Sequence, residues 1–376
     1  MHLAKIESVH IRGFRSLVDV KLSNLQNANV LIGANGSGKS NFIRFFEMLS
    51  WMLRSRRLTE FVGLQGGADD QLYGGNQVTP RMEAELVLRT EAGLNHYRFA
   101  LVHAHPDRFI FVDEAFRFTA SDFSTDAPWQ HTTTGQSEAA ILDVAQGLSS
   151  HGVNPTTARV IVQLLKGCAV YQFHDTSNTS NFKKRWDVED NNYLRTHGGN
   201  LAAVLHRLAR EDIQRLDLIS HYIRRVLSVF DSFQIDESYG KVSLRWKPIG
   251  TEKTLGAHLT SDGSLRLFAL VTLLNLPLEM LPNVLLLDEP ELGLHPAAIA
   301  LVGAMIKSLA VDRQIVVATQ SPLLVNAFDL DEITVLELQE GRTTLHKPKS
   351  DEYLRWLDEG FMPGEMWQKN LIGGRP

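Results

Sequence analysis

The 376-residue chain has one cysteine, no long apolar run and no excess of basic charge. A single thiol cannot form an internal disulfide, and the apolar surroundings of Cys168 favour a buried, unreactive thiol in a reducing compartment. No apolar run approaches the ~18 residues of a membrane span, and charged residues interrupt the N-terminal segment where a signal peptide would be apolar. The sequence therefore predicts a cytoplasmic protein with no membrane partner.

The charges are nearly balanced, with 38 Lys and Arg residues against 43 Asp and Glu residues and a net charge of −5. This balance excludes a uniformly basic nucleic-acid-binding protein but allows a local basic patch. Residues 1–57 carry nine Lys or Arg residues against three acidic residues, a surplus of six. The end of this segment, with Arg54, Arg56 and Arg57, is either a DNA-facing patch or a solvated helix end.

Repeats, low-complexity tracts and sustained heptads are also missing, which argues against a solenoid or a long coiled coil. The histidines lack Cys or carboxylate partners at the spacing of zinc ligands, so no zinc site is predicted. Residues His174, Asp175 and Ser177 are too close in sequence to face one another as a catalytic triad must.

The chain is organised around a glycine-rich octapeptide that follows an apolar run, residues 29–32, and precedes a predicted helix, residues 41–57. Its sequence is that of a complete phosphate-binding P-loop, since glycines let backbone N–H groups close around an anion. Lys39 can reach the outer phosphates and the Ser40 hydroxyl can ligate Mg²⁺. The sequence predicts that ATP and Mg²⁺ bind here, through Asn35, Gly36, Ser37, Gly38, Lys39 and Ser40.

A second group of candidate residues follows the apolar run 284–287, which has the pattern of a strand buried on both faces of a parallel sheet. The run ends in Asp288-Glu289-Pro290, where α/β sheets bind their ligands. Asp288 is placed to hold Mg²⁺, and Glu289 can polarise the attacking water. A solvated acidic turn is the alternative interpretation.

Two further segments have both a chemical and a purely structural interpretation. The apolar run 314–318 ends in Thr319-Gln320-Ser321-Pro322, where Gln320 could sense the γ-phosphate, or the turn could only cap a helix. In the glycine-rich loop from residue 63 to residue 75, Gln65 or Gln71 could approach the nucleotide, or both could be ordinary loop residues.

The remaining pattern predicts further elements and a helical region from residue 155 to residue 230, clearest from 211 to 230. Strands are expected at residues 2–11, 18–22, 235–246 and 333–338, an antiparallel meander at 82–118, and helices at 265–276 and 296–309. A surface excursion is expected from 122 to 135. The tail from residue 353 carries two tryptophans and a Gly-Gly pair, and no role follows from its sequence.

Taken in order, the motifs of the chain resemble those of ABC-type ATPases: the P-loop, Ser-Asp-Gly-Ser at 261–264, Asp-Glu-Pro at 288–290, Glu-Leu-Gly-Leu-His-Pro at 291–296 and Thr-Gln-Ser-Pro at 319–322. The opening at residues 11–16 is similar to the N-terminal signature of the RecF/SMC branch. The ending, residues 364–374, resembles that of the bacterial predicted "AAA family ATPase" group.

The resemblance implies an α/β fold: an ABC-type ATPase head with an antiparallel β lobe, a central mostly parallel sheet and a helical insertion. The expected division is a P-loop lobe with the β meander at 1–150, a helical lid at 151–232, a signature and Walker B lobe at 233–345 and a tail at 346–376.

The resemblance also assigns roles to single residues. Arg15 would contact the nucleotide, Ser261 and Gly263 would contact the γ-phosphate bound to a second protomer, and Glu289 would be the catalytic base. Gln320 would occupy the position of the switch histidine, although Gln cannot gain a proton as His can. Asp262 stands where a small residue is usual, and both departures bear on the rate of hydrolysis.

The function implied is an ATP-hydrolysing switch that dimerises around two nucleotides. It would act on DNA in repair or phage defence, alone or with a nuclease or toxin effector subunit. The alternative is a regulatory module that holds ATP without turnover. A transporter subunit is disfavoured by the N-terminal signature and by the interrupted spacing between Lys39 and Asp288.

Overall fold

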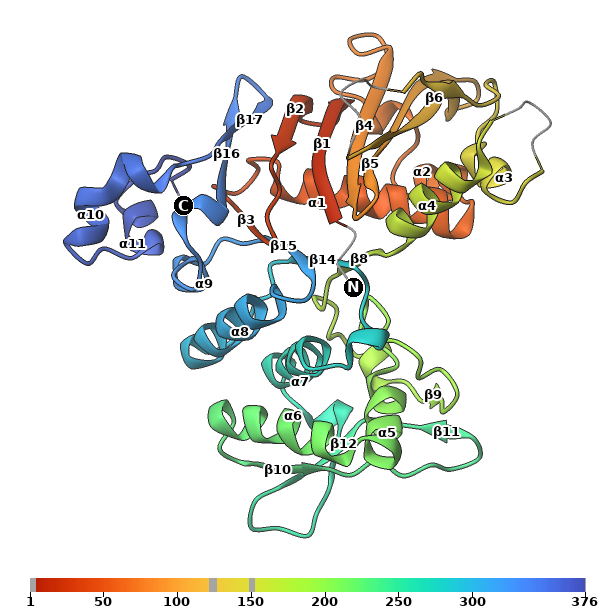
Figure 1. The fold of residues 1–376 in the computed structure, drawn as a ribbon. Helices are drawn as coiled ribbons and strands as arrows, with labels where there is room; N and C mark the ends of the chain where they lie inside the picture. The colour runs from red at the N-terminus through yellow and green to blue at the C-terminus, as the bar shows by residue number, and fades with distance from the viewer. Residues whose placement is uncertain (1–4, 122–126, 149–152, 376) are drawn as a thin grey trace.

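A computed structural model describes residues 5–121, 127–148 and 153–375. Figure 1 shows an antiparallel sheet with helices α1 to α4 beside it, a second sheet in the middle, and a separate lobe built around α5 and α6. No helix of these described residues is long and apolar enough to span a membrane.

The antiparallel sheet has the strand order β2-β1-β4-β5-β6-β7. In β4, inward-facing Met82, Ala84, Leu86 and Leu88 alternate with more exposed residues, as one buried face requires. The predicted meander is confirmed by the pairing of β4 with β5 and β5 with β6. The strands are β1 (Lys5–Phe14), β2 (Leu17–Ser23), β4 (Arg81–Thr90), β5 (Gly93–Ala104), β6 (Arg108–Ala120) and β7 (Gln130–His131).

The predicted surface excursion lies partly outside the described residues, since 122–126 are not among them. Its second half returns to the sheet, because β7 pairs with β6.

The central sheet has the order β17-β16-β3-β15-β14-β8, and all its pairs are parallel except β16 with β17. Every residue of β3, β14 and β15 is buried, which explains their continuous apolar sequences. Because β3, β15 and β14 are parallel neighbours, their carboxyl ends meet at one edge of the sheet. The strands are β3 (Ala28–Ile32), β8 (Cys168–Tyr171), β14 (Val284–Asp288), β15 (Gln314–Ala318), β16 (Ile333–Gln339) and β17 (Arg342–His346).

The helices cover both sheets and build the separate lobe, which also contains short strands. The helices are α1 (Lys39–Ser50), α2 (Leu58–Leu64), α3 (Ile141–Ala145), α4 (Pro155–Lys166), α5 (Leu201–Glu211), α6 (Ile213–Val226), α7 (Asp262–Leu274), α8 (Pro296–Leu309), α9 (Pro322–Val325), α10 (Leu354–Asp358) and α11 (Pro363–Gln368). The short strands are β9 (Trp186–Asp187), β10 (Phe230–Phe233), β11 (Lys241–Val242), β12 (Arg245–Pro248) and β13 (Leu255–Gly256).

Several predicted elements differ from those observed. The helix expected at 41–57 is α-helical only to Ser50 and continues as a π-helical turn, Trp51–Ser55. The strand expected at 235–246 is interrupted by a turn in which Tyr239 and Gly240 both have positive φ angles. The stripe expected along 211–230 ends early, because α6 stops at Val226 and Phe230 lies in β10.

The region expected to be a helical lid contains β8, which pairs with β14 as the edge strand of the central sheet. This strand carries Cys168, which is buried as predicted, and burial raises the pKa of its thiol to about 12. Helix α4, just before it, contacts α3 and β5 of the antiparallel lobe. Both elements therefore pack with the P-loop half of the molecule, and the separate lobe begins after Tyr171.

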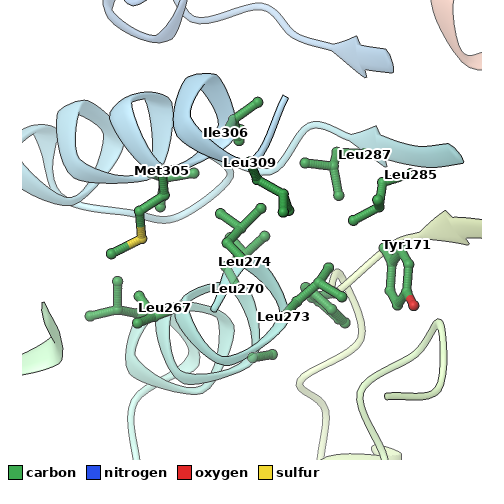
Figure 2. Close-up of a cluster of buried hydrophobic side chains, with 14 of the residues drawn as sticks. Tyr171, Leu267, Leu270, Leu273, Leu274, Leu285, Leu287, Met305, Ile306 and Leu309 are labelled. Carbon is green, nitrogen blue, oxygen red and sulfur yellow. The ribbon is translucent and has the colours of Figure 1, made fainter. Parts of the chain in front are cut away.

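Helix α7 is buried on nearly all sides and joins the separate lobe to the central sheet. Figure 2 shows its leucines, among them Leu270 and Leu274, packed between β14 and α8. Each fully buried leucine contributes about 1.5–3 kcal/mol relative to an exposed one, so this contact fixes α7 firmly against β14. The start of α7 and the end of β14 are therefore held at a fixed separation.

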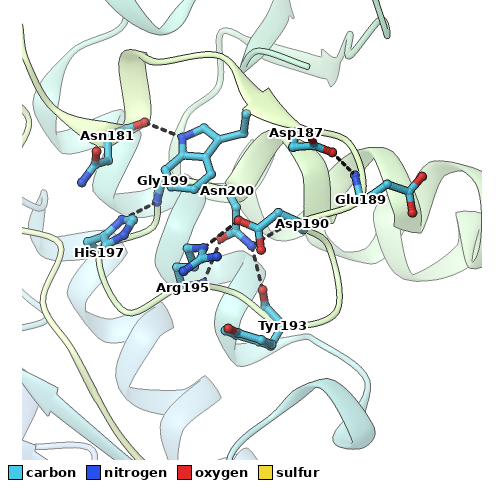
Figure 3. A network of polar contacts seen from close by, with 10 residues as sticks. Asn181, Asp187, Glu189, Asp190, Tyr193, Arg195, His197, Gly199 and Asn200 are labelled. Carbon is cyan, nitrogen blue, oxygen red and sulfur yellow. Dashed lines mark hydrogen bonds and ion pairs between the residues drawn. The ribbon is translucent and has the colours of Figure 1, made fainter. Parts of the chain in front are cut away.

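The segment that leads from β8 to α5 contains only the short strand β9, and polar contacts hold much of it (Figure 3). Asn200 donates to the carbonyls of Asp190 and Tyr193, both at 2.8 Å, and accepts from the backbone of Arg195 at 2.9 Å. Arg195 also pairs with Asp190 at 2.6 Å. Since Asn200 is fully buried, these bonds satisfy a polar group that would otherwise be costly.

Candidate nucleotide-binding site

The P-loop connects β3 to α1 with the backbone that its glycines require. Gly36 and Gly38 have φ angles of 80° and 105°, a region that disfavours side chains. A Cβ on Gly38 would also lie 2.1 Å from the Thr343 hydroxyl oxygen. This close approach explains why the position is glycine.

Lys39 lies folded over its own loop and is only 4% exposed. Its ammonium group donates to the carbonyls of Gly33 at 2.6 Å and Ala34 at 3.0 Å. Burial lowers the pKa of Lys39, and the carboxylates of Glu289 and Asp288 oppose that shift. The ammonium group is therefore held by its own loop and feels the negative charge at the acidic end of β14.

A series of hydrogen bonds among hydroxyl and amide groups holds the P-loop in place. Thr343 donates to the Ser37 carbonyl at 3.0 Å and shares a hydrogen bond with the Ser16 hydroxyl at 2.7 Å. Asn41, in the first turn of α1, donates to the same Ser16 oxygen at 2.8 Å. These bonds tie the turn between β1 and β2 to the P-loop, which the sequence did not predict.

Arg15 lies in that turn with a φ angle of 49°. Its guanidinium Nε donates to Gln71 Oε1 at 3.0 Å, and its backbone N–H donates to the Gln71 carbonyl at 2.9 Å. Burial, followed by the charge of Arg44, lowers the pKa of Arg15. Gln71 is fully buried and also donates to the carbonyl of Gln65, so in this structure both glutamines organise the loop around Arg15.

Asp288, the last residue of β14, is 7% exposed and has an incompletely satisfied carboxylate. Its Oδ2 accepts from Gln172 at 2.8 Å, and its carbonyl accepts from His174 at 3.0 Å. Its buried Oδ1 has no hydrogen-bond partner among the described residues. Burial raises the pKa of Asp288, and the charge of Glu289 adds to this effect.

Gln172 is a functional candidate that the sequence did not predict. It follows β8, and the pairing of β8 with β14 brings its amide to Asp288, 116 residues away. The available signal was the short apolar run 168–171 followed by a polar residue, but this run lies within a region of mostly helical pattern.

Glu289 and Gln320 lie together at the ends of β14 and β15. The Gln320 side-chain amide donates to Glu289 Oε1, and Glu289 has a φ angle of 45°. Glu291 supports this pair, because its Oε1 accepts from the Thr319 hydroxyl at 2.6 Å and from the Gln320 backbone at 2.9 Å. Burial raises the pKa of Glu291. A role for Glu291 in holding Gln320 was not predicted.

Ser261 and Gly263 lie at the start of α7. The Ser261 hydroxyl caps the helix by accepting from the Ser264 backbone at 3.2 Å, and Ser261 is exposed. A Cβ on Gly263 would lie 2.6 Å from the carbonyl of Gly293. The structure thus groups Asp288, Glu289 and Gln320 with the P-loop, and it groups Ser261 and Gly263 with the loop after β14.

The basic end of residues 1–57 is largely occupied by structural contacts. Arg56 forms a two-point ion pair with Asp143 at 2.7 Å, and Arg57 lies 3.5 Å from Glu60. Arg54 donates to the carbonyl of Lys166 at 2.5 Å. These contacts favour the structural interpretation of the three arginines over a DNA-facing patch.

Comparisons with known proteins match two parts of the chain to family models. A model described as "AAA ATPase domain" matches residues 5–62, and one described as "AAA domain, putative AbiEii toxin, Type IV TA system" matches residues 163–326. The DNA replication and repair protein RecF of Anaeromyxobacter dehalogenans (strain 2CP-C) is 34% identical over 91 residues. That match covers 24% of this chain and 24% of the RecF protein, so the chain matches about a quarter of its curated relative.

Solved structures resemble the chain over nearly its whole length. An SmcHead bound to the C-winged helix domain of ScpA has a TM-score of 0.59 and 16% identity, and covers 93% of this chain and 99% of that one. An Smc head domain with an extended coiled coil, bound to the C-terminal domain of ScpA derived from Pyrococcus furiosus, has a TM-score of 0.59 and 15% identity. It covers 95% of this chain and 99% of its own.

The chain has the fold of the SMC head domains that it resembles. The predicted fold class is confirmed, since this head-like fold has an antiparallel β lobe and a mostly parallel central sheet. The helical insertion, α5 and α6, is compact (Figure 1).

Proposed function

We propose that the chain binds ATP through the P-loop and hydrolyses it. The observation that carries this proposal is the placement of Lys39, Asp288 and Glu289, which follow β3 and β14 at the same carboxyl edge of the central sheet. A cation for the outer phosphates and carboxylates for a metal and a water are the groups that phosphoryl transfer to water needs. We assign nucleotide contact to residues 35–40 and to Arg15.

The residues present fit Mg²⁺. Asp288 has a buried carboxylate oxygen without a partner in the described part of the chain, and such an oxygen is stabilised by a cation. Asp288 and the exposed Ser40 hydroxyl would hold the ion. When bound, it would neutralise charge on the phosphates.

For hydrolysis, we assign Glu289 to accept a proton from the attacking water. Gln320 holds Glu289 through its side-chain N–H, which leaves the amide oxygen of Gln320 free to accept from the same water. Glu291 fixes Gln320 through the backbone, so the base and its partner are pre-positioned. Because Gln320 does not titrate, it can orient the water but not shuttle a proton.

At the level of the whole protein, we propose a cytoplasmic switch that dimerises around two nucleotides and acts on DNA in repair or phage defence. The support is the match to RecF, which is named a DNA replication and repair protein, and the likeness to SMC heads bound to ScpA. Residues 163–326 match a model described as belonging to a toxin–antitoxin system, so we place the protein in a system of more than one component and propose an effector partner of the nuclease or toxin class. A regulator that holds ATP without turnover is the second candidate. It is favoured by Gln320 at the position of the switch histidine and by Asp262 at a position where a small residue is usual.

Titration calorimetry with ATP and Mg²⁺, together with phosphate release, tests the assignment of the P-loop. Lys39→Ala should weaken ATP binding at least about tenfold, because a charge-assisted hydrogen bond worth about 1.5–3 kcal/mol is lost. Lys21→Ala, on the exposed face of β2, is the matched control and should bind as the wild type does. Unchanged affinity in a folded Lys39→Ala protein would refute the P-loop assignment. Binding without phosphate release would favour the regulator.

A further inference from the structure

The segment from residue 361 to residue 375, whose sequence suggested no role, returns to the nucleotide site. It carries α11, which packs on α9, the helix that begins directly after Gln320 and Ser321. Figure 1 shows the C-terminal end of the chain beside β16 and β3. The segment therefore touches elements on two sides of the site.

The N-terminal part of the segment packs tightly against α9. The backbone N–H of Gly364 donates to Asn326 at 2.8 Å, and a Cβ on Gly364 would lie 1.9 Å from the carbonyl oxygen of Pro322. Pro322 is two residues after Gln320, whose amide holds Glu289. A displacement of α11 would therefore be passed directly to the residues that face the γ-phosphate in the proposed mechanism.

At its second end the segment reaches the P-loop. A Cβ on Gly374 would lie 2.2 Å from Val335 and 3.7 Å from the Cα of Gly33, the first P-loop glycine. Gly374 has a φ angle of 63°, and its backbone N–H donates to Glu337 at 2.7 Å. Glycine is thus required here for both space and backbone conformation.

Trp367 joins the two ends. Its ring is fully buried beside α9, and its indole N–H donates to the carbonyl of Gly374 at 2.5 Å. A buried indole N–H with a single short bond fixes the distance between α11 and Gly374. One side chain therefore links the helix after Gln320 to Gly374, which lies beside the P-loop residue Gly33.

We propose that residues 361–375 form a positioning clamp for ATP hydrolysis, in which Trp367 holds α9 and the P-loop in register. This inference rests on the proposed ATPase function and deepens it. A loosened clamp leaves the P-loop contacts to the nucleotide in place but lets Gln320 and Glu289 move relative to the phosphates. Since small misplacements of reacting groups have large effects on rate, the clamp acts on kcat rather than on affinity.

The test compares the wild type with Trp367→Phe, which keeps an aromatic ring but removes the indole N–H. We expect kcat to fall about tenfold, the effect of roughly 1.4 kcal/mol, while the Kd for ATP changes less than about twofold. Hydrogen exchange of residues 361–375 should be faster in the variant than in the wild type, both with and without ATP and Mg²⁺, because the link between α11 and Gly374 is lost. Trp186→Phe is the matched control, since it removes an indole N–H bond of the same kind, to the Asn181 carbonyl at 3.0 Å, outside residues 361–375, and it should behave as the wild type does.

Gly374→Ala tests the same link without changing the packing of the indole ring, and it should also lower kcat with little change in Kd. If both variants hydrolyse ATP at the wild-type rate, or if residues 361–375 exchange in Trp367→Phe as slowly as in the wild type, the clamp is refuted and the ATPase assignment stands. A wild-type protein that binds no ATP would refute the ATPase assignment, and the clamp with it.

Discussion

At the scale of single residues, the carboxylate of Asp288 is only partly satisfied by hydrogen bonds. One of its oxygens is buried without a partner within the described ranges, and burial raises its pKa. Asp288→Asn removes the charge but keeps an oxygen that can accept from Gln172. We expect the ligand-free protein to gain about 1–2 kcal/mol in its free energy of unfolding, because an uncompensated buried charge is costly. Urea denaturation without Mg²⁺ measures this gain, and a loss of stability would contradict it.

The same residue predicts a pH dependence of stability. The raised pKa values of Asp288 and Glu291 mean that the folded state binds more protons than the unfolded state between the ordinary values, 3.8 and 4.5, and the raised folded values. The stabilising contribution of these groups to the free energy of unfolding is therefore present at low pH and is lost as the pH rises through this window. Asp288→Asn should reduce the decrease in the free energy of unfolding with rising pH. Asp236→Asn, at an exposed position, should leave this decrease unchanged. Equal slopes in all three proteins, from denaturation at several pH values, would contradict the prediction.

At the scale of elements, Arg266 on α7 connects two loops of the site, the loop after β8 and the loop after β14. Its guanidinium donates to the carbonyls of Phe173 at 3.1 Å, His174 at 2.9 Å and Leu292 at 3.2 Å. Arg266→Lys keeps the charge but cannot present donors in three fixed directions. We expect the free energy of unfolding to fall by about 2–3 kcal/mol, since hydrogen bonds from charged groups are worth about 1.5–3 kcal/mol each.

Thermal and urea unfolding measure this loss, with Arg207→Lys as the matched control. Arg207 pairs with Glu211 four residues away on the surface of α5, where such a pair contributes only a few tenths of a kcal/mol. Equal losses in the two variants would mean that Arg266 acts as a surface charge and not as a connector of loops.

The elements also show how far the sequence could predict this site. The P-loop and the Asp288-Glu289 pair are each a short continuous stretch of sequence, and the apolar runs before them are buried on both faces. The local sequence pattern was therefore sufficient to predict both. Gln172 reaches Asp288 only because β8 joins a sheet whose other strands are far away in sequence. A strand of four residues between helices has no periodicity of its own to reveal it. Likewise, the proposed roles of Trp367 and Gly374 depend on the packing of α11 against α9, which the local sequence pattern does not predict.

At the scale of the whole molecule, the exposed start of α7 suggests how two copies would meet. Ser261 is exposed while its neighbour Gly263 packs against Gly293, so the loop is rigid and open to a partner. In the proposed dimer, Ser261 of each copy closes over the γ-phosphate of the other. Such reciprocal contacts require two-fold symmetry, with both nucleotides enclosed at the interface.

Glu289→Gln should trap this dimer, because it removes the carboxylate that accepts a proton but retains its shape and an oxygen that can accept from Gln320. Light scattering with ATP and Mg²⁺ should then report twice the mass of the monomer. Adding Ser261→Arg should restore the monomer by placing bulk and charge in the interface, whereas adding Ser238→Arg, at an exposed turn of the separate lobe, should leave the dimer intact. If Glu289→Gln stays monomeric with saturating ATP, or if its dimer survives Ser261→Arg, then Ser261 only caps α7, and any assembly of this protein uses another surface.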